Sequence, residues 1–293
     1  LTNTADFNVV IAPGFNDPDN NYEVLNAKGV SQLKDLLASG TDLSKKDVIV
    51  DLNGETMDSN IALNAHSVAV ENGTVDASQL SAKAEEGVTL RNVKLAGSFP
   101  KASSNARVIV ETAGDVVVDG LDYTGATDGY NPLEINLRNV VSKNITVKNC
   151  KFANFTNNAM SVFGMAEGGV LNIENNTFDL AKTSEAVRIS NKTNTKFTIN
   201  VKDCSYTYPS DATGQWVGFF LFEDYTSTAA EVNTAMQFKN LTINVDNVTF
   251  DGAKVTELNL FSGARNQFAC MCYDNLQGLI VTDATHFPTF TFK

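Results

Sequence analysis

The chain has 293 residues, of which 43% are hydrophobic, and it carries a formal net charge of −12. This length and composition support one large domain or two ordinary ones with a sizeable core, and they exclude a disordered chain. Because an acidic protein repels phosphate backbones, nucleic acid is not an expected partner. The chain has only two histidines, which excludes most zinc sites, and only four cysteines, which excludes a disulfide-stapled scaffold.

The first 47 residues are predicted to form a polar lead and one helix. In the lead, residues 1–27, Asp17, Asp19 and Asn21 have the spacing of ligands in a calcium loop, so Ca²⁺ is the one cofactor that the sequence suggests. A calcium loop would have a bidentate glutamate at its twelfth position, where this chain has Lys28. A solvated turn without a metal is therefore the favoured interpretation.

A helix is predicted over Gly29–Gly40, where the apolar residues have helical spacing. Ser31 is the expected N-cap and Gly40 the expected C-terminal stop. A stack of repeats leaves its end coil uncovered, and the repeats of this chain follow the helix. We therefore expect the helix to cap the N-terminal end of the fold formed by residues 48–293.

An eight-residue phrase recurs through the remainder of the chain. It reads apolar, polar, apolar, charged, Asn-like, variable, polar and large apolar, as in Ile145–Phe152. Its copies begin at Val88, Val116, Ile145, Leu171, Ile199 and Ile243, with a weaker copy at Val68. The alternation at the start of the phrase predicts a half-buried β-strand, and the spacing of 26 to 29 residues between the first five copies predicts one such strand per coil.

Two columns of the aligned phrases predict how each strand ends and what fills the interior. The fifth column holds residues that tolerate the left-handed backbone conformation, which predicts a tight bend after each strand. Its members are Asn92, Gly120, Asn149, Asn175, Asp203 and Asn247. The eighth column holds large side chains, which would stack into an interior ladder. Its members are Leu95, Tyr123, Phe152, Phe178, Tyr206 and Phe250.

The fourth column alternates in charge from one copy to the next. It consists of Arg91, Asp119, Lys148, Glu174, Lys202 and Asp246. If the copies are adjacent parallel strands, about 4.8 Å apart, each charge lies between opposite charges. Such pairs favour the aligned register over a slipped one by roughly 0.2–1 kcal/mol each, so this column independently predicts the stacking.

A second short strand precedes four of the copies, at Arg107–Val110, Leu133–Leu137, Met160–Phe163 and Ala186–Ile189. Two or three short strands per coil, with no helices between them, predict an all-β parallel solenoid. In coil length, Asn-rich bends and stacked columns the sequence resembles the pectate-lyase-like (pectin-lyase-like) family of right-handed parallel β-helices. The resemblance covers residues 48–293. It implies a single-stranded right-handed β-helix and says little about function.

The step to the last copy is 44 residues, which predicts an insertion near residues 207–237. The insertion is rich in aromatic residues, whose faces are suited to sugar rings when they lie on the flank of a solenoid. The predicted ligand-binding residues are Tyr208, Trp216, Phe220 and Tyr225. The alternative is that Gly218–Phe222 is a strand buried on both faces, because contiguous exposed aromatic residues are rare on soluble proteins.

Carboxyl groups are the catalytic groups of interest, because many β-helices that this chain resembles cleave polysaccharides. The acidic residues of the fourth column have cationic neighbours, which lower a carboxyl pKa and do not suit a general acid. The others of interest are Glu134, Glu185, Glu223, Asp224 and Glu257, of which no two share a motif. Glu134 and Arg188 remain as the catalytic candidates. The aspartate, histidine and lysine elements of the family's polygalacturonases and lyases are not found, so the sequence leans away from an enzyme.

The sequence therefore favours a non-catalytic protein, extracellular or on the outer cell surface, that binds a polysaccharide or a surface protein complex. One form would be a lipoprotein accessory of an outer-membrane nutrient-uptake complex, similar to the surface and secreted β-helix lipoproteins of gut bacteria. No apolar run is long enough to cross a membrane, so a lipid anchor would lie before Leu1. The alternatives are a polysaccharide lyase or glycoside hydrolase with a diverged site, and a phage fibre or spike module.

Overall fold

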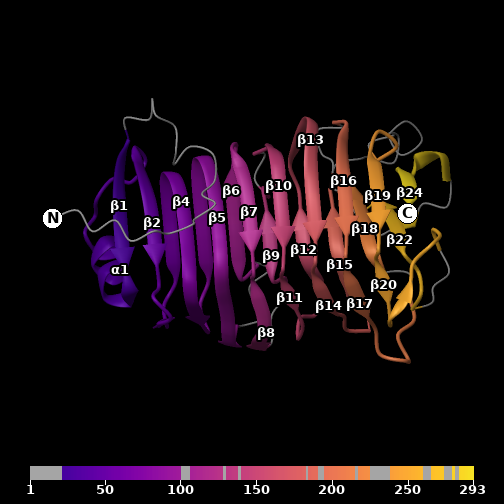
Figure 1. The fold of residues 1–293 in the computed structure, drawn as a ribbon, viewed down its shortest axis with the longest axis horizontal. Helices are drawn as coiled ribbons and strands as arrows, with labels where there is room; N and C mark the ends of the chain where they lie inside the picture. The colour runs from indigo at the N-terminus through magenta and orange to yellow at the C-terminus, as the bar shows by residue number, and fades with distance from the viewer. Residues whose placement is uncertain are drawn as a thin grey trace.

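The computed structural model describes residues 22–99, 106–127, 130–137, 140–182, 184–190, 195–214, 217–224, 238–259, 265–273, 279–280 and 284–293. In this part of the chain the strands form one continuous sheet, and nearly all neighbouring strands are parallel. The sheet winds coil upon coil into an elongated parallel β-solenoid, with α1 (Gly29–Ala38) and β1 at one end and β24 at the other (Figure 1). No helix among these residues is long and apolar enough to cross a membrane.

The strands stack in three rows, and a typical coil passes through the second row, then the first, then the third. The first row consists of β1 (Glu23–Lys28), β2 (Lys46–Asp51), the middle of β4 (Ile61–Asp76) and of β5 (Leu80–Ser98), β7 (Asp115–Asp119), β10 (Ser142–Lys148), β13 (Met165–Glu174), β16 (Phe197–Lys202), β19 (Thr242–Asp246) and β24 (Thr289–Phe292). The second row consists of the starts of β4 and β5, then β6 (Val108–Thr112), β9 (Leu133–Ile135), β12 (Asn158–Val162), β15 (Glu185–Ile189), β18 (Gly218–Asp224) and β22 (Ala269–Tyr273). The third row consists of β3 (Thr56–Met57), the ends of β4 and β5, β8 (Asp122–Thr127), β11 (Lys151–Phe152), β14 (Thr177–Asp179), β17 (Ser205–Thr207) and β20 (Thr249–Phe250). Two short strands, β21 (Ala253–Lys254) and β23 (Leu279–Ile280), pair antiparallel with β20 and β22, and a 3-10 turn covers Ala284–His286.

The repeat predicted from the sequence is confirmed residue by residue in the first row. The first residue of each phrase lies beside the first residue of the next, from Val68 and Val88 onward to Ile243. The predicted second-row strands are also in register, because β6, β9, β12 and β15 pair in that order. The chain therefore stacks as parallel coils, as the spacing of the phrases predicts.

Left-handed residues end the first-row strands, as the fifth column predicts. The φ angles in this column lie between 49° at Asn92 and 74° at Gly120. The side chains also bond along the stack: Asn175 Nδ2 donates to Asn149 Oδ1 at 2.8 Å, and Asn149 Nδ2 donates to Asp119 Oδ1 at 2.7 Å. Asparagine therefore has two roles at the bend. Its backbone tolerates the left-handed conformation, and its side chain forms a hydrogen bond to the neighbouring coil.

The eighth column lies inside the solenoid, as predicted. Phe152 and Phe178 stack with ring centroids 5.3 Å apart and an interplanar angle of 6°. The first five side chains of the column are at most 1% exposed, whereas the last, Phe250, is half-buried. Burying one large apolar side chain stabilises a fold by about 1.5–3 kcal/mol, so this column is a major source of the stability of the stack.

The alternating charges of the fourth column lie side by side on adjacent strands, as predicted. Lys148 Nζ is 3.6 Å from Asp119 Oδ2. The alternation ends toward the N-terminus, where Asp51 lies beside Glu71. Burial, and then the neighbouring Asp51 carboxylate, raise the pKa of Glu71, as expected for like charges on adjacent strands.

Reversing one charge of this column should weaken the stack. Lys148→Glu places three acidic residues on consecutive strands, and we expect the free energy of unfolding at low salt to fall by about 1 kcal/mol in urea denaturation. The loss should shrink in about 1 M salt, which screens partly exposed charges. Lys143→Glu, on the same strand but outside the column, changes the net charge equally. An equal loss in this control would contradict the pairing.

The N-terminal end of the stack differs from the prediction in two details. A strand that the sequence did not predict, β1, precedes the helix and pairs with β2. The predicted N-cap, Ser31, is wrong, because α1 begins two residues earlier and Lys28 holds the cap position without a side-chain bond. A distant side chain serves the first turn instead: Val30 N–H donates to Glu55 Oε2 at 2.8 Å. The predicted stop is confirmed, since Gly40 has a φ of 66°.

Candidate functional site

Two of the predicted aromatic ligand-binding residues are wrong, because their side chains lie in the core. Phe220 of β18 is 0% exposed and Tyr208 is 5% exposed, so neither presents a ring to a sugar. The Tyr208 hydroxyl is bonded to the backbone, where it accepts from Gly218 N–H at 2.8 Å. The alternative is confirmed, since the four residues that follow Gly218 are all buried.

The other aromatic candidates and the calcium candidates lie outside the described residues. They are Trp216, Tyr225, Asp17, Asp19 and Asn21. Within the described ranges, no group of three or more histidine, cysteine, aspartate or glutamate side chains is placed to hold a metal ion. The predicted site residues that remain are Glu134 and Arg188, both in the second row of strands.

Glu134 and Arg188 lie on the same side of the second row. Ser161 lies between them, beside Glu134 on one neighbouring strand and beside Arg188 on the other. Two strand spacings place the Cα atoms of Glu134 and Arg188 about 9.6 Å apart. Both side chains are enclosed by protein, since Glu134 is 4% exposed and the Arg188 side chain 11%. Coil spacing explains why they are near each other, whereas their burial could not be inferred from it.

Asparagine side chains join these two residues to a second carboxyl group, that of Glu185. Asn131 Nδ2 donates to Glu134 Oε1 at 2.7 Å, and Asn158 Nδ2 donates to Glu185 Oε2 at 2.7 Å. The two asparagines are themselves joined, because Asn158 N–H donates to Asn131 Oδ1 at 3.3 Å. Arg188 Nη1 donates to Asn158 Oδ1 at 3.3 Å. The result is one polar network that crosses β9, β12 and β15.

The guanidinium group of Arg188 lies close to three carboxyl groups, those of Glu134, Glu185 and Glu223. Arg188 forms an ion pair with Glu223, and neither Glu134 nor Glu185 forms an ion pair with a described residue. Burial raises the pKa of Glu134, and it raises the pKa of Glu185 to about 8. Glu185 therefore holds its proton at neutral pH, because the low-dielectric interior disfavours its charged form.

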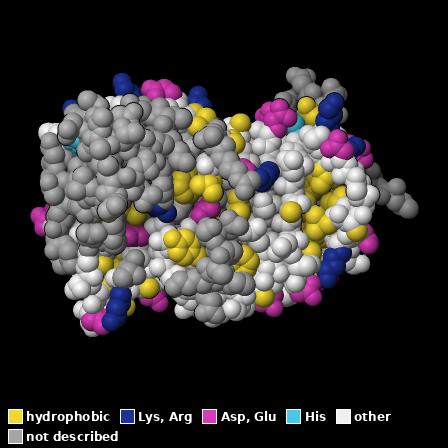
Figure 2. Space-filling view, turned by 180° about the vertical axis from the view of Figure 1, so that it is seen from behind, with side chains coloured by type: hydrophobic (Ala, Val, Ile, Leu, Met, Phe, Trp, Pro, Cys, Tyr) yellow, Lys and Arg dark blue, Asp and Glu magenta, His cyan; other side chains and the backbone are white. Residues whose placement is uncertain are grey.

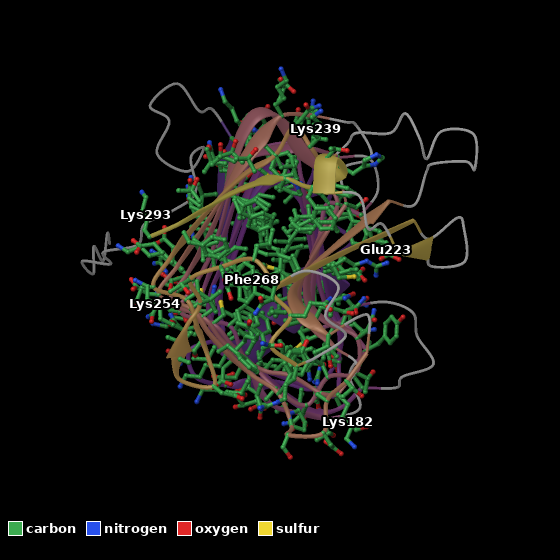
Figure 3. All side chains as sticks on the ribbon, turned by 90° about the vertical axis from the view of Figure 1, so that its right-hand side faces the viewer. Lys182, Glu223, Lys239, Lys254, Phe268 and Lys293 are labelled. Carbon is green, nitrogen blue, oxygen red and sulfur yellow. The ribbon has the colours of Figure 1, made fainter. Side chains whose placement is uncertain are left out.

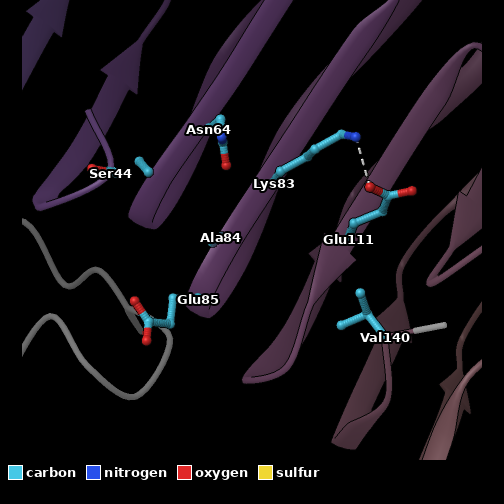
Figure 4. Close-up of a pocket in the computed structure, with 8 residues that line it drawn as sticks. Ser44, Asn64, Lys83, Ala84, Glu85, Glu111 and Val140 are labelled. Atoms are coloured by element: carbon cyan, nitrogen blue, oxygen red, sulfur yellow. Dashed lines mark ion pairs between the residues drawn. The ribbon is translucent and has the colours of Figure 1, made fainter. Parts of the chain in front are cut away.

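An open pocket of about 330 Å³ lies over the N-terminal half of the second row. Lys83 of β5 and Glu111 of β6 point toward each other in it (Figure 4). Lys83 Nζ is 2.7 Å from Glu111 Oε2, and the two side chains are 33% and 8% exposed. Ser44, Asn64 and Glu85 add further hydrogen-bonding side chains, and all three are exposed. We call this the Lys83–Glu111 pocket.

The Lys83–Glu111 pocket favours a polar and uncharged ligand. Its hydroxyl, amide, ammonium and carboxylate groups can bond to ligand hydroxyls as donors or as acceptors. Glu111 neutralises Lys83, and Glu85 adds a negative charge, so an anionic ligand would be repelled. The volume is at the lower end of the range for small-molecule sites. A short stretch of a neutral sugar chain matches these properties.

The sequence analysis missed Lys83 and Glu111, although a signal for them is present. They are 28 residues apart and lie side by side on β5 and β6, as residues one coil apart do. The run Leu80–Ala84 also has the apolar alternation of a second-row strand. The signal is hidden because β5 continues without interruption from the second row into the first, so no bend residue separates the two.

Acidic and basic side chains are scattered over the described surface of the face seen in Figure 2 and form no large patch of one sign there. The charges of the described residues are therefore not concentrated at one site of that face. Comparison with family models, with curated proteins and with solved structures gives no match. The ligand class is therefore inferred from the protein's own side chains.

Proposed function

We propose that this protein is a non-catalytic binding protein of the cell exterior that holds a neutral glycan in the Lys83–Glu111 pocket. The observation that carries the proposal is an open, hydroxyl-compatible pocket around a fixed ion pair on the flank of a regular solenoid. The scaffold would be a right-handed parallel β-helix, secreted or held on the outer surface by a lipid anchor. Service to an outer-membrane nutrient-uptake complex fits such a protein.

The burial of Glu134 and Arg188 supports binding over catalysis. Each is engaged by other side chains, Glu134 by Asn131 and Arg188 by Glu223 and Asn158. A catalytic carboxyl group must reach the proton that it transfers, within hydrogen-bond distance or through one water. Groups enclosed by protein in this way stabilise the coils rather than meet a polymeric substrate.

A glycoside hydrolase is the second candidate, and one observation favours it. Glu111 and Glu134 lie on the same side of the adjacent strands β6 and β9, with Cα atoms about 8 Å apart by strand geometry. Burial raises the pKa of Glu134, as a general acid requires, and Glu134 Oε2 has no hydrogen-bond partner among the described residues. Lys83 pairs with Glu111, so Glu111 would be the second carboxyl group of such a pair and lies beside a cation.

Binding to a panel of neutral and acidic oligosaccharides tests the first proposal. Lys83→Ala and Glu111→Gln should each weaken the binding of a neutral oligosaccharide by about tenfold, which corresponds to about 1.4 kcal/mol. Lys151→Ala removes an exposed lysine from the third row and serves as the matched control, with binding unchanged. A preference for acidic oligosaccharides, or equal affinity in all three variants, would contradict the proposal.

The same panel separates the two candidates when bond cleavage is followed by product analysis. The binding protein should leave every oligosaccharide intact. Turnover that is lost in Glu134→Gln and in Glu111→Gln, with folding retained by circular dichroism, would identify the hydrolase and overturn the non-catalytic proposal. Arg188→Ala should also abolish such turnover, because Arg188 lies two strands from Glu134 on the same side of the second row.

A further inference from the structure

The third row ends in a hairpin that leaves the regular stack near the C-terminal end. β20 and β21 are antiparallel and are joined by Asp251 and Gly252. Both residues have left-handed φ angles, 47° and 81°, which is the backbone of a type I′ turn. β21 lies beside β20, which pairs with β17 in parallel, and it runs antiparallel where a strand of a next coil would run parallel.

Arg265 holds this hairpin in place. Its guanidinium forms an ion pair with Asp251 and donates from Nη2 to the Tyr208 carbonyl oxygen at 2.7 Å. The guanidinium carbon also lies 5.2 Å from the centroid of the Phe250 ring, within cation–π range. Backbone bonds fix the segment that follows, because Val255 N–H donates to the Val248 carbonyl oxygen at 2.8 Å. The geometry beside the hairpin is therefore preorganised.

A second pocket, of about 170 Å³, lies between this hairpin and the returning chain. Its wall includes Phe250, the last ring of the interior column, which is half-buried while the preceding ring, Tyr206, is 1% exposed. Asn259 and Asn266 line the other side. We call this the Phe250 pocket. It combines an aromatic surface with amide groups, which the Lys83–Glu111 pocket does not.

Polar side chains around the Phe250 pocket have bonding capacity to spare. Lys254, Glu257 and Asn266 are exposed, and none of their side chains has a hydrogen bond or ion pair to a described residue. The Asn259 amide makes one long contact, 3.5 Å from Nδ2 to the Asn266 carbonyl oxygen. One ammonium and one carboxylate balance each other in charge, so the pocket as a whole is neutral.

We propose that the Phe250 pocket is a separate subsite for one neutral pyranose ring, such as the terminal residue of a glycan. Tyr206 and Arg265 lie against the Phe250 ring, so the apolar face of a sugar would contact the part of this ring that stays exposed. Its hydroxyls would bond to the amides of Asn259 and Asn266 and to Glu257. The volume is about half that of the Lys83–Glu111 pocket, which suits a single ring. This inference shares its ligand class with the proposed function but uses none of the same residues.

The two pockets are too far apart to be one site. Seen end-on, Lys254 lies on the opposite side of the stack from Glu223, a second-row residue (Figure 3). Along the axis, the step from β5 to β20 crosses five strand spacings of the third row, roughly 24 Å. A single ring can therefore occupy only one of the pockets, and each can be tested alone.

The test is a titration of the full chain with methyl glycosides of glucose, galactose and mannose and with N-acetylglucosamine, followed by saturation-transfer NMR. At least one should bind saturably at millimolar concentration, and Asn266→Ala and Glu257→Gln should each weaken it by about fivefold or more. Phe250→Leu, which keeps an apolar side chain in the column, should weaken it further. Lys239→Ala, an exposed lysine at the same end of the stack, is the control and should bind as wild type does.

Two results would overturn the subsite. One is the absence of saturable binding by all four sugars, and the other is wild-type affinity in Asn266→Ala and Glu257→Gln. If Lys83→Ala instead abolishes monosaccharide binding, the ring occupies the Lys83–Glu111 pocket, so this inference fails while the proposed function stands. If Asn266→Ala abolishes it and Lys83→Ala weakens no oligosaccharide, the Phe250 pocket stands and the proposed function fails.

Discussion

Replacing Arg107 with alanine is expected to lower the free energy of unfolding by about 4 kcal/mol, because a buried guanidinium group that joins two coils is lost. Arg107 is 0% exposed, and its donors are bonded to backbone carbonyl oxygens. The acceptors are those of Val75, Ser78, Ala96 and Gly97. The group also lies over two rings, with its central carbon 5.7 Å from the Phe99 centroid and 6.0 Å from that of Tyr123.

The expected loss of stability follows from the position of these carbonyl groups. They belong to the ends of β4 and β5 and the residues beside them, where the chain turns and the ladder of strand bonds is interrupted. Burial lowers the pKa of Arg107, yet an arginine stays charged at any ordinary pH. Alanine would remove the guanidinium donors from these carbonyl oxygens. That of Ala96 keeps its bond from Ala77 N–H, and each buried group left unsatisfied costs about 1–3 kcal/mol.

Urea denaturation of wild type, Arg107→Ala and Arg107→Lys would measure this effect. Lysine keeps the charge but cannot present donors in the planar fork of a guanidinium. The free energy of unfolding of Arg107→Lys should therefore lie between those of wild type and Arg107→Ala. Lys202→Ala, in the partly exposed charge column, is the comparison and should cost about 1 kcal/mol or less. A loss below about 1 kcal/mol in Arg107→Ala would show that the coils do not depend on this group.

Glu185→Gln is expected to stabilise the protein at pH 9 and to change its stability little at pH 4. Burial raises the pKa of Glu185 to about 8, above its value in the unfolded chain. The stability that the protonated group contributes is complete below the unfolded pKa, near 4.5. It is lost as the pH rises through 8, because the folded protein must then bury a charge. The difference between the two values corresponds to at most roughly 5 kcal/mol.

Glutamine imitates the protonated carboxyl group and keeps an oxygen that can accept from Asn158 Nδ2. Thermal unfolding at several pH values should therefore show wild type losing stability between about pH 5 and pH 8 relative to the variant. Glu86→Gln, which replaces an exposed carboxyl group on β5, should follow wild type across this range. Parallel curves for wild type and Glu185→Gln would contradict a proton held by the folded state.

The sequence predicts the first row of strands well because its signals are local and repeated. Asn149, for example, belongs to a phrase whose apolar alternation, charge sign and bend residue all recur, so several columns fix the same register. The second row has no such marker residue. Lys83 and Glu111 therefore remain unassigned, although they are one repeat apart.

Burial across coils is the information that the sequence lacks. The aromatic run at Phe219–Phe222 is compatible with a ligand platform and with a core strand, and only the packing of β18 decides in favour of the core. Arg107 stands at the start of an ordinary strand pattern, and its acceptors lie 10 to 32 residues away in the sequence. The raised pKa of Glu185 depends on being enclosed by neighbouring coils, which no local pattern records.

The central claim is that a neutral glycan occupies the Lys83–Glu111 pocket, and mapping by NMR tests it most directly. The protein, labelled with ¹⁵N, would be titrated with the neutral oligosaccharide that binds best in the panel. The account predicts that backbone amide shifts gather around Ser44, Asn64, Lys83 and Glu111, and that in Lys83→Ala they saturate only at about tenfold higher oligosaccharide concentration. Shifts confined to the first row of strands, or no saturable shifts at all, would contradict it.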